Sequence, residues 1–230
     1  MTDSRLTLEE RIEAELKSYD GTMGLYIDDL KGNVITRFPD EKFETASTIK
    51  VYILAALFDA IGQGKASLKD MLTCEERFWI DGSGILGSLE VGTTLSVKNV
   101  ATLRIIVSDN IATNEIMDVI GMERFNSFCR EMGYQNITLM RKMMDFEAIQ
   151  QGKNNYMCAG ETGRLLSAIS RGEFVNPEIS QTIFDIMASQ QCRNKLPALL
   201  PAVASYSGSK SAIPEGQVLV ANKTGDLVGI

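Results

Sequence analysis

One short stretch restricts the fold of this chain more than any other: VYILAALF, residues 51–58, is apolar on nearly all sides. A helix of that kind has no stripe that can face solvent, so other elements must cover it from every direction. With 230 residues, of which 44% are hydrophobic, the chain is long enough to bury such a helix. The sequence therefore predicts a folded globular protein, in one large domain or two interleaved ones, with this helix at its centre.

The apolar spacing separates a long helical block from β-rich segments on either side of it. An amphipathic helix is expected near the charged N-terminus, and further helices at residues 97–107, 112–120, 123–132, 159–171 and 176–190. Runs 23–27 and 34–38 flank a turn cluster and predict an antiparallel hairpin, and 218–221 predicts a late strand. The glycine-rich segment 81–92 and the segment 139–156 are expected to be the roomiest loops.

This order of elements predicts an α/β (α+β) fold. A mostly antiparallel sheet would be flanked by helices and would carry a large inserted helical domain, since strands far apart in sequence can share one sheet. Residues 1–46 and 206–230 would form the discontinuous sheet domain, and residues 47–205 the helical domain.

Charge and cysteine spacing exclude several classes of partner. The net charge is −7 with no dense basic cluster, which argues against nucleic acid. No apolar run resembles a signal peptide or a membrane span, so the chain as written is expected to be cytoplasmic, or secreted if a signal was removed. Four cysteines without CxxC spacing favour four reduced thiols; two disulfides would need an oxidising compartment.

The chain contains no histidine. That absence excludes Ser-His-Asp and Cys-His catalysis and HExxH zinc sites. If the protein is a hydrolase, its general base must be a lysine or a carboxylate.

The apolar helix is headed by Ser47-Thr48-Ile49-Lys50, an S-x-x-K tetrapeptide. On a helix, residues i and i+3 share a face, so Ser47 Oγ and Lys50 Nζ are expected within hydrogen-bond reach. Burial would favour the neutral amine, which can take the proton of a serine nucleophile. A second copy, Ser207 to Lys210, lies in a loop with no such constraint. For the tetrapeptide alone, a structural lysine is the commoner explanation.

Two further motifs follow in order: Ser108-Asp109-Asn110 after an apolar helix, and Lys223-Thr224-Gly225 after the expected last strand. The set S-x-x-K, S-D-N and K-T-G is typical of penicillin-binding proteins and class A β-lactamases. From about residue 24 to its end, the chain resembles this class A β-lactamase-like family, and residues 81–121 are similar to the family segment around S-D-N. The resemblance implies an active site in the cleft between sheet and helical domains, without a metal or cofactor.

The resemblance also implies roles for individual residues. Ser47 would be the acylated nucleophile, Lys50 its proton acceptor and Ser108 the proton relay to the leaving nitrogen, while Asn110 would hold the amide of the substrate. The N–H groups of Ser47 and Asp226 would form the oxyanion hole.

Lys223 and Thr224 would bind the carboxylate of the substrate, and Gly225 would let that strand approach the ligand. Asn114, one helical turn past the S-D-N motif, matches another polar position of the family. Each motif has a structural alternative, because Ser-Asp makes a good helix cap and Thr-Gly a good turn.

The chain departs from the family pattern at two places. Arg141 matches the arginine of the family's omega loop, but Met143 stands where the glutamate that activates the deacylating water is expected. Asp145 and Glu147 are the nearby carboxylates that could substitute, although a salt bridge is the commoner role for each. The sequence stops at Ile230, before the family's last strands and helix, which suggests a truncated chain or a rearranged sheet.

The leading functional hypothesis is a serine hydrolase that opens β-lactams through an acyl-enzyme on Ser47, with slow deacylation. A DD-peptidase or small esterase using the same serine is the second hypothesis, which Met143 favours somewhat. A penicillin-binding sensor that stays acylated and a catalytically inactive scaffold are the remaining alternatives. A small-molecule substrate is the expected partner, with no nucleic acid and no membrane span.

Overall fold

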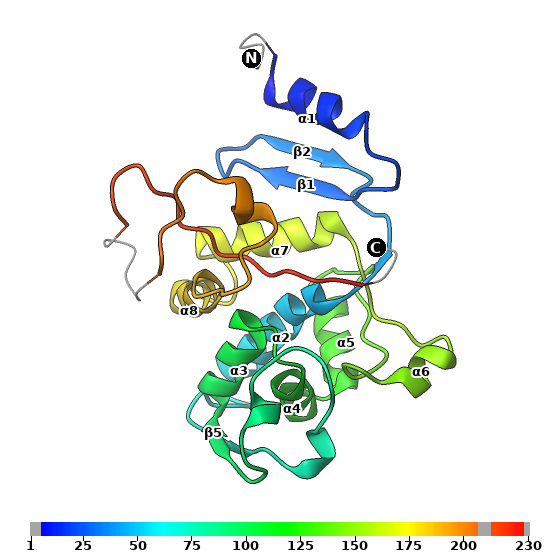
Figure 1. Ribbon diagram of the computed structural model, residues 1–230, viewed down its shortest axis with the longest axis vertical. Coiled ribbons are helices and arrows are strands. Elements are labelled where there is room, and N and C mark those ends of the chain that lie inside the picture. The colour runs from blue at the N-terminus through cyan, green and yellow to red at the C-terminus, as the bar shows by residue number, and fades with distance from the viewer. Residues whose placement is uncertain (1–5, 207–212, 228–230) are drawn as a thin grey trace.

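The computed structural model describes residues 6–206 and 213–227. Its longest axis runs from helix α1 and a β-hairpin at one end, past α7, to the cluster of α2 to α5 at the other (Figure 1). The helices are α1 (Leu8–Leu16), α2 (Lys50–Gly62), α3 (Val97–Ile106), α4 (Asn110–Ile120), α5 (Met122–Glu131), α6 (Phe146–Gln150), α7 (Ala159–Arg171) and α8 (Pro177–Ala188). The strands are β1 (Leu25–Asp28), β2 (Val34–Arg37), β3 (Phe43–Glu44), β4 (Met71–Thr73), β5 (Thr94–Ser96) and β6 (Tyr156–Met157).

Helix α2 is the centre of the core, as its all-round apolar sequence predicts. Every residue from Lys50 to Phe58 is buried, and α3, α4, α5 and α8 all pack against the helix. A short 3-10 turn, Ser47–Ile49, leads directly into it. The nucleophile candidate therefore stands at the start of a helix that is packed on several sides.

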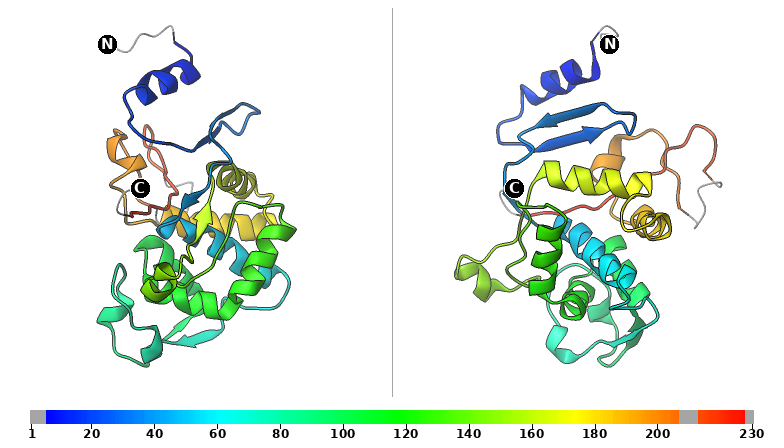
Figure 2. Two further views of the ribbon diagram at one scale, coloured as in Figure 1. Left: turned by 90° about the vertical axis from the view of Figure 1, so that its right-hand side faces the viewer. Right: turned by 180° about the vertical axis from the view of Figure 1, so that it is seen from behind.

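The predicted hairpin is confirmed in antiparallel register, with Leu25 opposite Arg37 and Asp28 opposite Val34. Helix α7 supports it, because β1 packs on α7 and Asp28 accepts hydrogen bonds from Ser167 and Arg171 of that helix. In all three ribbon views the hairpin lies between α1 and α7 (Figure 2). These helices and strands confirm the predicted α/β class.

The strand expected at 218–221 is wrong. Among the described residues, the three sheets are two-stranded antiparallel pairs, β1-β2, β3-β6 and β4-β5, and Val218 makes only an isolated parallel bridge to Val203. The backbone partners of Val218 lie after α8, because its N–H donates to Ala202 O and its carbonyl accepts from Ala204 N. Just past the run, Asn222 N donates to Met187 O, and Gln190 Nε2 donates to Asn222 O. This segment is thus held by the end of α8 and the chain that follows it, and it does not extend the hairpin.

Several predicted boundaries also shift by one or two residues. Helix α4 begins at residue 110, two residues earlier than expected, because the Asp109 side chain caps it. Helix α5 runs one residue earlier at each end than predicted. All four cysteine thiols are free.

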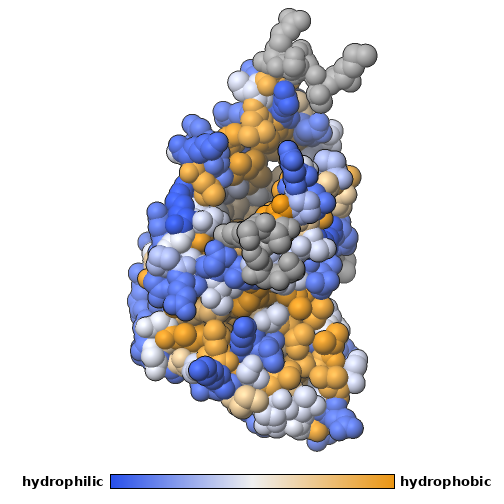
Figure 3. All heavy atoms as spheres, turned by 90° about the vertical axis from the view of Figure 1, so that its left-hand side faces the viewer, coloured by the Kyte–Doolittle hydropathy of each residue, from blue (hydrophilic) through white to orange (hydrophobic). Residues whose placement is uncertain are grey.

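The surface of the α1 end is partly apolar. Helix α1 has no buried residue, and Leu8, Val34 and Phe38 are exposed. On the face of Figure 3, hydrophobic side chains reach the surface in the upper part, where α1 and the hairpin lie. No helix in the described part of the chain is long and apolar enough to cross a membrane. The division into domains at residues 46 and 206 stays a prediction.

Candidate active site

Lys50 is the buried centre of the site. Its side chain is inaccessible to solvent, and Nζ lies 2.7 Å from the carbonyl oxygen of Ser108, 2.7 Å from Asn110 Oδ1 and 3.2 Å from Ser108 Oγ. Ser47 Oγ is not among the hydrogen-bond partners of Nζ found in the described residues. The expected direct Ser47–Lys50 bond is thus replaced by bonds to the S-D-N motif, whose carbonyl and amide oxygens are strong acceptors.

The surroundings of Lys50 favour its neutral form. Burial lowers the pKa of its ammonium group to about 6, and the positive charges of Lys223 and Arg104 contribute to this lowering, whereas Asp109 and Cys192 oppose the shift. Burial likewise lowers the pKa of Lys223 to about 8. At neutral pH, Lys50 is therefore predominantly an amine, while Lys223 remains predominantly an ammonium ion.

A neutral amine has two N–H donors and one lone pair. The carbonyl of Ser108 and Oδ1 of Asn110 can only accept, so they take the two N–H groups of Lys50. The hydroxyl of Ser108 is the remaining partner and is able to donate to the lone pair. Lys223 Nζ donates to the same hydroxyl oxygen over 3.1 Å. Ser108 Oγ thus links the two lysines in one hydrogen-bonded chain.

Ser108 owes its place to an unusual backbone conformation. Its φ is +57°, in the left-handed region that a non-glycine residue enters only at some energetic cost. The loop 81–92 supports this conformation, because Ser83 Oγ donates to the Ser108 carbonyl over 2.7 Å and Asn110 N donates to the Ser83 carbonyl over 2.9 Å. This turn aims both the carbonyl and the hydroxyl of Ser108 at Lys50.

Asp109 is structural, as the capping alternative predicts. Its Oδ1 accepts from Ala112 N at the start of α4, and Oδ2 accepts from the N–H groups of Ile85 and Leu86. A methyl group at Gly84 would lie 2.3 Å from the Asp109 carboxyl carbon, so only glycine allows the loop to approach this closely. The middle residue of the S-D-N motif therefore fixes the glycine-rich loop to α4.

The K-T-G segment lies directly against the Ser47 turn. A methyl group at Gly225 would lie 2.9 Å from Ala46 Cβ and 3.1 Å from the backbone nitrogens of Ser47 and Thr48. The absent side chain thus permits two backbone segments to approach, in addition to the expected approach of a ligand. The structure therefore brings residues from all three motifs together.

Lys223 and Asp226 have different environments. Lys223 Nζ donates to the Thr224 carbonyl as well as to Ser108. The side chain of Asp226 is largely exposed and pairs with Lys195 Nζ at 2.5 Å, and Lys195 also donates to the Gly225 carbonyl. Only the backbone N–H of Asp226 is a candidate for the oxyanion hole, since an ionised carboxylate has no hydrogen to donate to an oxyanion.

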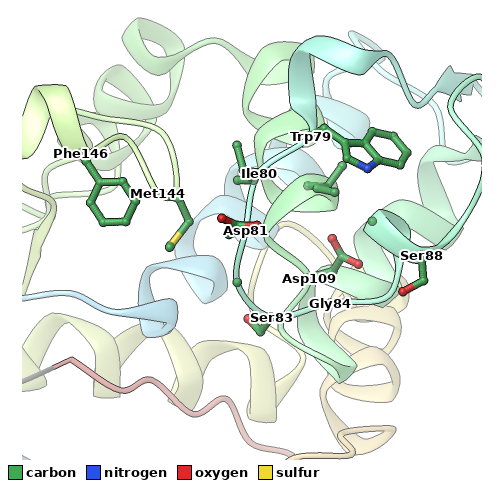
Figure 4. A pocket seen from close by; sticks show the side chains of 12 residues that line it. Trp79, Ile80, Asp81, Ser83, Gly84, Ser88, Asp109, Met144 and Phe146 are labelled. Atoms are coloured by element: carbon green, nitrogen blue, oxygen red, sulfur yellow. The ribbon is translucent and has the colours of Figure 1, made fainter.

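A cavity of about 360 Å³ opens beside Ser47. It is lined by Thr45, Ala46, Ser47, Gly82, Ser83, Asn110, Arg141, Met143, Met144, Phe146, Ile149, Asp226 and Leu227. A neighbouring hollow of about 470 Å³ shares Gly82, Ser83, Met144 and Phe146 with it and continues toward Trp79. In Figure 4, Met144 and Phe146 lie on one side of this hollow, and Trp79 and Ser88 lie on the other. The two together provide an elongated site with polar and apolar walls.

On the loop 139–156, Met143 is held by its backbone. Its N–H donates to Asn114 Oδ1 over 2.8 Å, and Asn114 Nδ2 donates to its carbonyl over 3.2 Å. Arg141 supports the same loop by donating from Nη1 to the Lys142 carbonyl and from Nε to Asn154. Asn114 is thus a loop anchor, and the cavity-lining residue that it holds carries a thioether.

The two candidate carboxylates of this loop are placed differently. Asp145 caps the short helix α6 by accepting from Ala148 N over 3.0 Å. Glu147 is exposed and accepts from Gln151 one helical turn later. Neither lines the cavity beside Ser47, so the geometry does not favour either as the base for a deacylating water.

Sequence reasoning missed Ser83, Arg104 and Lys195. Arg104 is the one with a readable signal, because a charged residue stands on α3 one helical turn after Val100, within an apolar stripe. Ser83 and Lys195 lie in loops, where periodicity carries no information about contacts. The second S-x-x-K copy, Ser207 to Lys210, lies outside the described residues.

The sequence pattern of the β-lactamase enzyme family matches residues 7–230. The chain belongs to this family. The resemblance inferred from the three motifs is thereby confirmed. Within this family, β-lactamase SME-1 of Serratia marcescens is 26% identical over 167 residues, which is 71% of this chain and 56% of that protein. The match thus spans little more than half of that relative's length.

Solved structures of similar proteins share this fold. A β-lactamase from Sphaerobacter thermophilus superimposes with a TM-score of 0.80 at 25% identity, over 94% of this chain and 77% of that one. PBP-A superimposes with a TM-score of 0.78 at 27% identity, over 95% of this chain and 77% of that one. A point mutant of PBP-A has been seen as an acyl-enzyme complex with penicillin G.

Proposed function

We propose that this protein is a serine acyl hydrolase that is acylated on Ser47 by β-lactams and releases the acyl group slowly. One observation carries the first half: a fully buried Lys50, with its pKa lowered to about 6, shares the hydroxyl of Ser108 with the cation Lys223. An amine that is neutral at pH 7 is the base that a histidine-free chain needs.

In the proposed acylation, Ser47 Oγ attacks the lactam carbonyl carbon and forms a C–O bond. The proton of Ser47 passes to Lys50, and the developing oxyanion is stabilised by the N–H groups of Ser47 and Asp226. The lactam C–N bond then breaks, and Ser108 delivers a proton to the leaving nitrogen and regains one from Lys50. Lys223 and Thr224 hold the substrate carboxylate, and Asn110 holds the side-chain amide of the substrate.

The loop 139–156, on the other side of the cavity, supports slow deacylation. A positioned general base contributes about 10² to 10⁴ in rate, and Met143 supplies none. Asp145 and Glu147 are engaged in and around α6, away from Ser47. We therefore expect water to attack the ester slowly, so that the acyl-enzyme accumulates.

Intact-protein mass spectrometry during incubation with penicillin G and with a chromogenic cephalosporin tests this proposal. We expect one acyl adduct per chain, located on Ser47, that persists after a single turnover and is absent in Ser47→Ala. Rapid multiple turnover without adduct would contradict slow release. No adduct and no turnover would contradict acylation by β-lactams.

A second candidate is a DD-peptidase or small esterase that uses the same serine. The thioether at position 143 favours it, because no carboxylate is aimed at the acyl group and another acceptor, such as an amine, could release it. Cleavage of a D-Ala-D-Ala peptide that is abolished in Ser47→Ala would support the DD-peptidase. Ester cleavage that is abolished in Ser47→Ala, with no β-lactam adduct, would support the esterase.

A further inference from the structure

Arg104 is a buried cation without a counter-ion. It lies on α3, is completely inaccessible to solvent, and takes part in no salt bridge within residues 6–206 and 213–227. Its Nη2 donates to the backbone carbonyl of Lys50 over 2.7 Å. Its Nε and Nη1 are buried and have no hydrogen-bond partner in the described part of the chain.

Such a residue is costly for folding. Moving a charge out of water costs several kcal/mol unless an opposite charge compensates it, and each unmade hydrogen bond adds to that cost. Burial lowers the pKa of Arg104 to about 9, so the group is still charged at neutral pH. An apolar side chain of similar volume would fill the same space at lower cost, so stability does not explain an arginine here.

The position of the guanidinium suggests what it does. Its hydrogen bond reaches the first residue of α2, and that residue carries the amine that the mechanism requires to be neutral. The other charged or titratable groups that act on Lys50 are Lys223, Asp109 and Cys192, and Asp226 acts in turn on Lys223. Asp109 alone among these brings a buried negative charge, and its oxygens are already engaged by three N–H groups.

We propose that Arg104 is a positioning residue for the base: it fixes the first turn of α2 through the Lys50 carbonyl and supplies a permanent positive charge that keeps the Lys50 amine neutral. This inference deepens the proposed function and rests on it, since a neutral Lys50 matters only if Ser47 is to be deprotonated. Like charges sharing a buried site disfavour each other's charged form. Arg104 thus lowers the stability of the fold, and its charge leaves Lys50 available as an unprotonated base at neutral pH.

The direct test is the titration of Lys50 in the substrate-free protein, followed by NMR of [¹³Cε]lysine from about pH 4.5 to 9, with the resonance assigned by its loss in Lys50→Arg. In Arg104→Met, we expect the midpoint to rise by on the order of one pH unit. Arg104→Gln removes the charge but keeps a side-chain N–H donor for the Lys50 carbonyl, and its Lys50 midpoint should rise by a similar amount if the charge is what matters. The acid limb of the Ser47 acylation rate should move upward by the same amount in both variants.

Thermal melting of the same variants separates charge from packing. Arg104→Met should be at least as stable as the parent, because no buried partner is left without its ion. An unmoved Lys50 midpoint in folded Arg104→Met would overturn the proposal, and so would loss of folding in both Arg104→Met and Arg104→Gln, which would make the residue structural. Because the titration needs no substrate, a normal Lys50 shift without Ser47 acylation would contradict the proposed function alone.

Discussion

The two walls of the cavity beside Ser47 are built in different ways. Behind the wall formed by the Ser47 turn and the start of α4, buried polar groups are bonded to one another: Lys50 to Ser108 and Asn110, and Lys223 to Ser108. On the wall formed by the loop 139–156, the backbone of Met143 is held by two hydrogen bonds with Asn114, yet its side chain carries no titratable group.

Acylation and deacylation need different catalytic groups, and the two walls differ in those groups. Acylation needs a base for Ser47 and a proton donor for the leaving nitrogen, and the first wall has candidates for both. Deacylation needs a base for water, and the described residues of the second wall aim none into the cavity. Under the proposed function, Ser47 is thus acylated readily and deacylated slowly.

The largest effect is expected from removing the base. Lys50→Met should slow acylation of Ser47 by about 10³-fold, because proton transfer to a positioned base is lost. The exposed Lys65, whose Nζ bonds only to Gln63 among the described residues, offers a matched control, and Lys65→Met should acylate at the parent rate. Rates are read from the growth of the adduct by quenched mass spectrometry. Equal rates in the parent and Lys50→Met would remove the first wall from the mechanism.

Each wall has a capping aspartate, Asp109 or Asp145, and the two are expected to contribute unequally to the free energy of unfolding. Asp109→Ala loses three hydrogen bonds of a buried carboxylate, and we expect it to lower the free energy of unfolding by about 3 kcal/mol. Asp145→Ala loses one cap on a five-residue helix, at a cost of about 1 kcal/mol or less. Urea unfolding measures both.

The Asp145→Ala variant also tests the loop carboxylate directly. Since Asp145 caps α6 and does not line the cavity, both the acylation and the deacylation rate should stay unchanged. A marked slowing of deacylation in Asp145→Ala, with folding intact, would show that the second wall does hold a base.

Giving the second wall a base should speed the proposed release of the acyl group. Met143→Glu should speed loss of the penicillin G adduct by about 10²-fold, because Asn114 holds the backbone at this position beside the cavity. Met143→Gln has nearly the same shape without a titratable group and should leave release slow. Similar release rates in the two variants would mean that the missing carboxylate is not what limits the second step.

A smaller effect is expected where the K-T-G segment meets the Ser47 turn. Gly225→Ala places a methyl group 2.9 Å from Ala46 Cβ, so the two segments must move apart slightly. We expect acylation to slow by about 10-fold, in line with the sensitivity of catalysis to misplacement, with little change in melting temperature. An unchanged acylation rate would show that the contact is not tight in solution.

Much of the fold was accessible from the sequence. The all-round apolar run predicted the central helix α2, and the period of 3.6 predicted α7 at its observed bounds. These signals are local, because amphipathic spacing and turn chemistry depend on neighbouring residues alone. Convergence of the three motifs came from the family resemblance, and Gly225 against Ser47 is the contact that brings two of them together.

The parts that could not be predicted depend on partners distant in sequence. The run at 218–221 alternates like a strand, but the residues around Met187 and Gln190 take the backbone bonds of the segment that follows it. The positive φ of Ser108 is supported by Ser83, which lies in a loop. The bonds of Lys50 to Ser108 and Asn110 also depend on residues distant in sequence. Helical periodicity places a residue on one face of a helix but does not say which acceptor its side chain binds.

The pH dependence of Ser47 acylation tests the central claim most directly. Because the pKa of Lys50 is lowered to about 6, the amine is free above that pH, and the single-turnover rate with penicillin G should rise through about pH 6. It should fall again above about pH 8, where Lys223 loses the charge that holds the substrate carboxylate. A bell with limbs near about 6 and about 8 is the predicted result; a rate that keeps rising toward about pH 10, as an ordinary lysine would require, would contradict the account.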